Sequence, residues 1–124
     1  MLAIPVIVAG EFAFGIAQSR HRDAYERALQ RMLDRCRVLE IGIENARHYA
    51  VIRLELKGAG TPIPANDVWI AALSRQHAMP VMSRDVHFDF VGGLRRRAWK
   101  FFQRLGRSAV VGIAHHAGRG FERP

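Results

Sequence analysis

The sequence predicts an α/β domain built around a short parallel sheet. Stretches with apolar residues at helical spacing alternate with short apolar runs of strand length as far as residue 91. Glycine and proline residues separate these stretches, as in GAG at 58–60 and TPIP at 61–64. Helices that alternate with short buried strands are typical of α/β domains with parallel strands.

The N-terminal part contains two expected helices and one strand. Pro5 has no amide hydrogen to lose in the first turn of a helix, so we expect a helix from there to Ala17. Asp23 is expected to cap a second helix, DAYERALQRMLDRC, which ends at Cys36. RVLEI at 37–41 has the composition of a short strand.

The next part predicts two more helices and two short strands. Apolar residues at helical spacing predict helices over 44–57 and 65–77, the first ended by the glycines of GAG. A buried strand is expected at 79–83, and FDFV at 88–91 is a candidate for another. LRRRAWKFFQRLGR at 94–107 is compatible with a basic amphipathic helix, and the glycine-containing remainder shows little pattern and is expected to be poorly structured.

Composition favours one cytoplasmic globular domain of 124 residues with 49% hydrophobic residues. No apolar run reaches the roughly 18 residues of a membrane span, so no membrane association is expected. The apolar N-terminal stretch lacks a basic leader and contains Glu11, which argues against a signal peptide. Cys36 is the only cysteine, which excludes an intrachain disulfide and fits a reducing cytoplasm.

The net charge of +8 is concentrated at the C-terminus. Residues 1–91 hold 11 Lys and Arg against 10 Asp and Glu, whereas residues 92–124 hold 8 basic residues and one acidic residue. Such a segment favours nucleic acid or an acidic partner through counterion release. A solvated basic tail explains the same composition equally well.

Three carboxylates are the candidates for chemistry. Asp67, alone, is more simply explained as an acid that complements a helix N-terminus. Asp85 follows a strand, however, and the helix that begins near Asp67 should run back along the sheet, so both acids are expected at one edge. Glu11 lies among apolar residues, where a carboxylate is costly unless it is paired or binds a cation. Three such acids together would suit Mg²⁺ or Mn²⁺ and phosphodiester chemistry.

Other chemistries receive less support from the sequence. His115 and His116 are adjacent and cannot readily face one metal, and the remaining histidines are scattered, so surface or hydrogen-bonded roles are expected for them. Neither a phosphate-binding loop of the Walker type nor a serine in a nucleophile elbow is present.

Two stretches together resemble the second half of a PIN domain of the VapC toxin type. They are PANDVWIAA at 64–72 and MPVMSRDVHFDFVGGL at 79–94. AIPVIVAGEFAFGIA is similar to that family's second acidic segment, and the resemblance extends from residue 3 to about residue 99. It implies a Rossmann-like α/β/α fold over residues 1–99, followed by a basic extension over 100–124. It also implies a cytoplasmic, Mg²⁺- or Mn²⁺-dependent endoribonuclease that cleaves RNA, forms a homodimer and is held inactive by a VapB-type antitoxin.

The family's functional residues map onto particular positions of this sequence. Glu11, Asp67 and Asp85 match the metal-binding, catalytic acids, Ser83 matches a supporting hydroxyl residue, and Asp89 is a looser match. The basic residues expected to contact nucleic acid are Arg95, Arg96, Arg97 and Lys100.

The N-terminus departs from this pattern. The family begins with a central strand that ends in an aspartate, and nothing before Glu11 matches it. We therefore expect the first strand to be missing and RNA cleavage to be very weak or lost. If Met1 is an internal start, the upstream reading frame should encode that strand. The alternatives are a catalytically inactive PIN-fold module that binds antitoxin or RNA, and a general nucleic-acid-binding protein that acts through residues 94–107.

Overall fold

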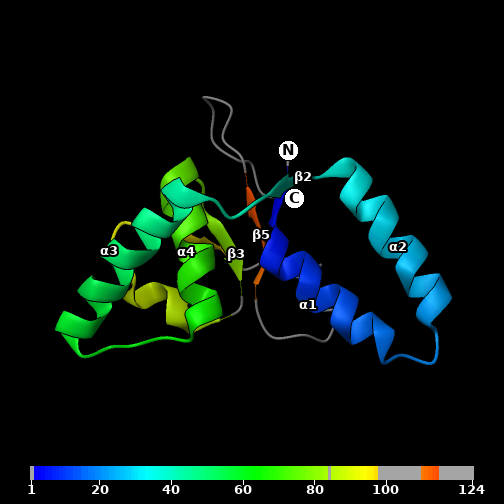
Figure 1. The fold of residues 1–124 in the computed structure, drawn as a ribbon, viewed down its shortest axis with the longest axis horizontal. Coiled ribbons are helices and arrows are strands. Elements are labelled where there is room, and N and C mark those ends of the chain that lie inside the picture. The colour runs from blue at the N-terminus through cyan, green and yellow to red at the C-terminus, as the bar shows by residue number, and fades with distance from the viewer. Residues whose placement is uncertain (1, 84, 98–109, 115–124) are drawn as a thin grey trace.

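The structure is a computed structural model that describes residues 2–83, 85–97 and 110–114. The described strands form one five-stranded sheet with the order β2-β1-β5-β3-β4. The elements are β1 (Leu2–Pro5), α1 (Val6–Ala17), α2 (Arg22–Arg35), β2 (Arg37–Leu39), α3 (Ile43–Ala59), α4 (Ala65–His77), β3 (Val81–Ser83), the 3-10 helix η1 (Val86–Phe90), β4 (Arg96–Arg97) and β5 (Val110–Ala114). In Figure 1 the α1–α2 hairpin lies to one side of the strands and the α3–α4 pair to the other.

The chain begins with a strand that the sequence did not indicate. Leu2–Pro5 forms β1, which pairs in parallel with β2 and places Ala3 opposite Arg37. The predicted helix forms as α1 and ends at Ala17 as expected, but Pro5 is its extended cap residue rather than part of its first turn. The strand is only four residues long, and its partner lies far along the chain, so local patterning carried little trace of it.

Helix α2 forms where it was predicted, but its N-terminus differs from the expectation. The helix begins at Arg22 with His21 as the cap residue, and Asp23 lies in the first turn without a capping hydrogen bond. None of its residues is fully buried. The partly buried Met32 and Leu33 pack against the main core and help to hold this helix to the rest of the molecule.

Helices α3 and α4 form the largest part of the core, and both were predicted. Ile52 and Leu56 of α3 belong to one buried cluster with Val68 and Ala71 of α4, and Ile4 and Val8 join this cluster from β1 and α1. The Tyr49 and Trp69 rings stack at 4.0 Å between centroids and fix the two helices against each other. The packing holds the first turn of α4 in a defined position.

The segment after β3 corrects two predictions. FDFV at 88–91 is not a strand, because Val86–Phe90 forms the 3-10 helix η1 with Phe88 completely buried. The amphipathic helix expected over 94–107 is also wrong at its start, since Arg96 and Arg97 form β4, parallel to β3. Residues 98–107, which include Lys100, lie outside the described part.

The middle of the sheet is occupied by β5, from a segment that was expected to be poorly structured. β5 pairs antiparallel with β1 on one side and with β3 on the other. Without it, the facing backbone groups of β1 and β3 would lack hydrogen-bond partners. Pairing on both sides stabilises this strand despite its weak sequence pattern. The boundary between residues 99 and 100 stays a prediction.

Among the residues that the structure describes, no helix is both long and apolar enough to cross a membrane.

Candidate metal centre

Asp67 lies in the first turn of α4, which follows the extended cap residue Pro64. The interior position of the next residue, Val68, which is 2% exposed, anchors this turn to the core. The Asp67 side chain is only 13% exposed. A carboxylate with so little contact to water needs another source of stabilisation, since the helix terminus contributes about 1 kcal/mol or less.

Asp85 reaches the same place from the end of β3. Its backbone amide donates to Ser83 Oγ at 2.9 Å, and its own Oδ1 accepts from the His87 amide at 2.9 Å. The first bond ties Asp85 to the buried strand, and the second makes it the cap of η1. Ser83, predicted as a supporting residue, therefore positions the backbone of the acid that follows it.

His87 lies between the two carboxylates. Its Nδ1 atom is 3.0 Å from Asp85 Oδ1 and 3.3 Å from Asp67 Oδ2. One ligand atom from each of these three residues lies within 4.8 Å of the others. From the sequence, His87 was expected at the surface or in a hydrogen bond, with no part in metal binding. Its spacing of two residues from Asp85 is the signal in the sequence that could have indicated this role.

The electrostatic setting of Asp67 is unfavourable for an ionised acid. Burial raises the pKa of Asp67, the charge of Asp85 raises it further, and the hydrogen bond to His87 lowers it in part. Both raising effects reflect negative charge that is insufficiently solvated or neutralised. A cation between the two acids would offset the second effect.

Glu11 lies beside this group rather than within it. It is exposed on α1, so the expected cost of burying its carboxylate does not arise. Its Oε1 accepts a hydrogen bond of 3.4 Å from Nδ2 of Asn66, the residue before Asp67. The structure thus brings Asp67 and Asp85 together, and it places Glu11 outside this group, linked to it through the side chain of Asn66. Asn66, for which the sequence predicted no role, connects Glu11 to the helix turn that carries Asp67.

Asp89 and Arg96 form an ion pair with each other. Arg96 Nε and Nη2 donate to the two Asp89 oxygens at 2.8 and 3.0 Å, and Nη1 donates to the Ser83 carbonyl at 3.2 Å. The Arg96 hydrogen bond lowers the pKa of Asp89. The Arg96 guanidinium is therefore occupied by contacts within the protein, whereas the neighbouring residues Arg95 and Arg97 are exposed.

The donor set fits a divalent cation. Two carboxylates supply hard oxygen ligands and most of the charge that a divalent ion requires, and an imidazole nitrogen adds a third donor. Three protein ligands on one side leave further coordination positions open toward solvent, because His87 is 42% exposed.

This fold and this acidic edge define an α/β domain with a candidate metal site, and the chain belongs to the PIN domain family, whose model matches residues 1–94. Ribonuclease VapC2 of Haemophilus influenzae is 26% identical over 99 residues, which cover 79% of this chain and 75% of that protein. Ribonuclease VapC5 of Mycobacterium tuberculosis is 28% identical over 94 residues, which cover 74% and 70%.

Solved structures agree with this assignment. DNA-bound VapBC from Salmonella typhimurium superposes with a TM-score of 0.73 at 26% identity, covering 78% of this chain and 74% of the other. VapBC-1 from nontypeable Haemophilus influenzae has the same TM-score and identity, with 80% and 75% covered. The predicted PIN-like fold and the resemblance to VapC toxins are confirmed.

Proposed function

We propose that this protein is a divalent-metal-dependent endoribonuclease of the VapC type. The observation that carries the proposal is the convergence of Asp67 and Asp85 from two separate elements, with ligand atoms close enough to hold one ion. The relatives named as ribonucleases support RNA as the substrate. The cytoplasm is the compartment that fits an RNA substrate and the single, unpaired Cys36.

Each residue of the centre has a distinct task. Asp67 and Asp85 would hold Mg²⁺ or Mn²⁺, and the first turn of α4 fixes the position of Asp67. A bound ion of this kind activates water and stabilises negative charge on a phosphodiester. Ser83 orients Asp85 through the backbone. Glu11, held by Asn66, would face the same edge and contact water or substrate there.

The position of Glu11 also supports a second function. Glu11 is exposed and outside the group formed by the two aspartates and His87, so among the described residues two carboxylates converge there rather than three. Catalysis is sensitive to misplacement of about 1 Å, which can reduce a rate about a hundredfold. A catalytically inactive PIN-fold module that binds antitoxin or RNA is therefore the alternative, and weak cleavage is expected even under the first proposal.

A cleavage assay separates these functions. Single-stranded RNA would be incubated with the full chain, with Mg²⁺, with Mn²⁺ or with a chelator. We expect weak cleavage that requires the divalent ion, and a loss of no less than about 100-fold in Asp85→Asn, because even residues that only support ligands contribute 10- to 100-fold. Asp34→Asn, an acid on the exposed surface of α2, is the matched control.

Two outcomes of this assay would redirect the proposal. RNA binding without cleavage under every metal condition would favour the binding module. Cleavage by Asp85→Asn at the rate of the unchanged chain would contradict the proposed centre itself.

The exposed arginines Arg95 and Arg97 are proposed to contact RNA phosphates. If each neutralises one phosphate of a single strand, changing both to Ser should reduce the log–log salt slope of RNA binding by about 1.4. Arg96→Ser should change the slope less, since Arg96 already pairs with Asp89. Fluorescence anisotropy over a salt series measures all three. Equal slopes for the double variant and the unchanged chain would remove these arginines from the interface. The same role for Lys100 stays a prediction.

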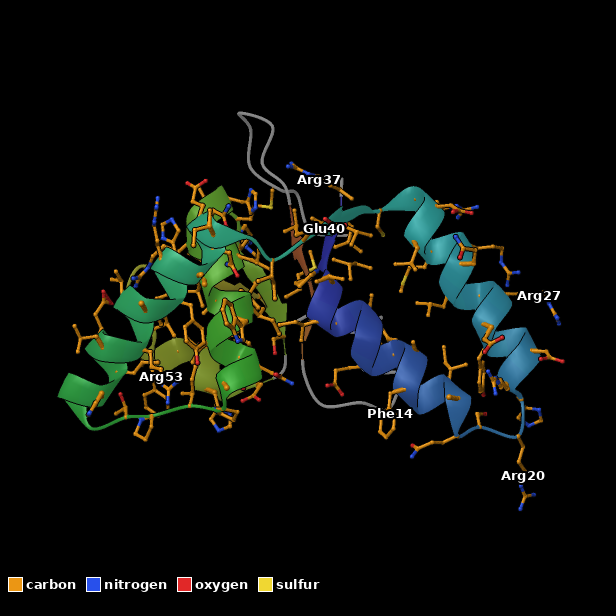
Figure 2. All side chains as sticks on the ribbon, viewed as in Figure 1. Phe14, Arg20, Arg27, Arg37, Glu40 and Arg53 are labelled. Atoms are coloured by element: carbon orange, nitrogen blue, oxygen red, sulfur yellow. The ribbon has the colours of Figure 1, made fainter. Side chains whose placement is uncertain are left out.

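A VapB-type antitoxin is the proposed protein partner, because the matched solved structures are described as VapBC from two organisms. Exposed aromatic side chains on the α1–α2 hairpin support a protein contact there. Phe14 is 64% exposed and Tyr25 is 48% exposed, and Figure 2 shows Phe14 projecting outward from α1. Homodimer formation is part of the same proposal, and light scattering of the isolated chain would measure it.

A further inference from the structure

We propose that His87 is a third ligand in the cation site and makes the site prefer later first-row divalent ions over Mg²⁺. The inference rests on the proposed function, because it assumes that Asp67 and Asp85 hold a cation. It adds a ligand that the acids alone did not suggest, and it names the class of ion that this particular chain should select.

The spacing of the three donor atoms suits one ion. Two ligands at right angles on an ion, each bonded at about 2.1 Å, lie about 3.0 Å apart. His87 Nδ1 lies 3.0 Å from Asp85 Oδ1 and 3.3 Å from Asp67 Oδ2. Small side-chain adjustments would therefore place a cation among the three atoms without moving the backbone.

The backbone holds His87 in place for this role. The His87 amide donates to Asp85 Oδ1 at 2.9 Å, so the two residues are joined through the turn that begins η1. The next residue, Phe88, is 0% exposed and anchors η1 in the core. The imidazole is consequently tethered close to the carboxylates, and little conformational entropy is lost when it binds.

The chemistry of the donors decides which ion is favoured. Carboxylate oxygens suit Mg²⁺ and Mn²⁺, whereas imidazole nitrogen binds Co²⁺, Ni²⁺ and Zn²⁺ more strongly, in the order expected for divalent ions. A neutral imidazole adds no charge, so it raises the affinity for these ions far more than for Mg²⁺. His87 would therefore act on metal choice rather than on the total electrostatic attraction.

The rival role of His87 is that of a hydrogen-bonding bridge between the acids, because the same distances suit hydrogen bonds. The two roles have opposite consequences. A ligand contributes to binding of a nitrogen-preferring ion, and its removal weakens that binding. A bridge occupies the carboxylate oxygens, and its removal frees them for any cation.

Calorimetric titration of the metal-free full chain with Mg²⁺ and with Co²⁺ tests the inference. We expect Co²⁺ to bind at least about tenfold more tightly than Mg²⁺, and His87→Ala to weaken Co²⁺ binding about 10- to 100-fold while changing Mg²⁺ affinity less than about threefold. His48→Ala, which removes an imidazole from α3, is the matched control. In the unchanged chain, Zn²⁺ should shift the nitrogen resonance of His87 Nδ1, which reports ligation independently of any variant.

The outcomes distinguish this inference from the proposed function. If Asp85→Asn abolishes Co²⁺ binding and His87→Ala leaves it unchanged or raises Mg²⁺ affinity, His87 is a bridge, and the inference is overturned while the centre stands. If neither variant affects binding, the cation site of the proposed function is wrong as well. An unshifted His87 resonance in the Zn²⁺-saturated chain would also overturn the inference.

Discussion

At the residue scale, two acids of like charge lie at the ends of neighbouring elements, and one of them has little contact with water. Asp67 is held there by the first turn of α4, and Asp85 by the turn after β3. Burial and the charge of Asp85 raise the pKa of Asp67, so the folded chain holds this proton more tightly than the unfolded chain does. The metal-free protein is less stable because of this arrangement, and a cation bound between the two acids would offset the cost.

Asp67→Asn should make the metal-free protein more stable at neutral pH. Because the folded-state pKa is raised, stability falls as pH rises from the unfolded value of about 3.9 through the folded value. The variant lacks this loss, so its advantage should be complete at pH 7 and disappear below the unfolded pKa. Urea unfolding at pH 7 and at about pH 3, below the unfolded pKa, measures the difference.

Asp34→Asn is again the control, since this acid is exposed on α2 and bonds only to the exposed Gln30 side chain among the described contacts, so its replacement should change stability little. An Asp67→Asn variant that is less stable than the unchanged chain at pH 7 would contradict the account of this acid.

At the element scale, α3 and α4 both end in a residue with left-handed backbone geometry. Gly60 closes α3 with φ of 73°, and Ala78 closes α4 with φ of 52°. The amides that follow bond back into each helix, from Thr61 to the Leu56 carbonyl and from Met79 to the Ser74 carbonyl. Glycine adopts this conformation without steric cost, whereas alanine does not.

Ala78→Gly should therefore stabilise the protein by about 0.5–1 kcal/mol. Relief of the left-handed conformation is worth about 1–2 kcal/mol, and the greater freedom of glycine in the unfolded chain offsets part of it. Gly60→Ala is the matched opposite change and should destabilise by about 1 kcal/mol or more. Chemical denaturation of both variants provides the comparison, and effects of the same sign would contradict this explanation of the helix ends.

At the scale of the whole molecule, β5 lies between the two strands that lead to the acidic residues. β1 runs into α1, which carries Glu11, and β3 runs toward Asp85. Ile113 pairs with Ala3 on one side and with Val81 on the other. The C-terminal segment thus aligns the two sides of the candidate centre through backbone pairing.

Ile113→Pro should lower the free energy of unfolding by about 2 kcal/mol or more, since it removes an amide donor from the middle of the sheet. Ala65→Pro is a suitable control, because it lies at the first position of α4, where the amide has no partner within the helix. Thermal unfolding followed by circular dichroism measures both. If Ile113→Pro unfolds at the same temperature as the unchanged chain, β5 does not hold the sheet together.

Several parts of this molecule followed from the sequence alone. The helix at 65–77 formed with the predicted bounds, and helices close to 44–57 and 23–36 formed as well, because apolar residues at helical spacing are a local signal, to which the glycines after 44–57 add a second. The proximity of Asp67 and Asp85 was also predicted. It follows from a general property of parallel sheets, in which the ends of strands and the starts of the packed helices share one edge.

Only the tertiary structure decided the sheet partners, the position of Glu11 and the role of His87. β1 and β5 are short strands whose stability comes from partners distant in the chain, so no local pattern revealed them. Glu11 is exposed because the apolar face of α1 is incompletely covered, which neighbouring residues in the sequence could not indicate. His87 joins the acids because η1 turns its ring toward α4, and this turn depends on burying Phe88 in a core built from the whole chain.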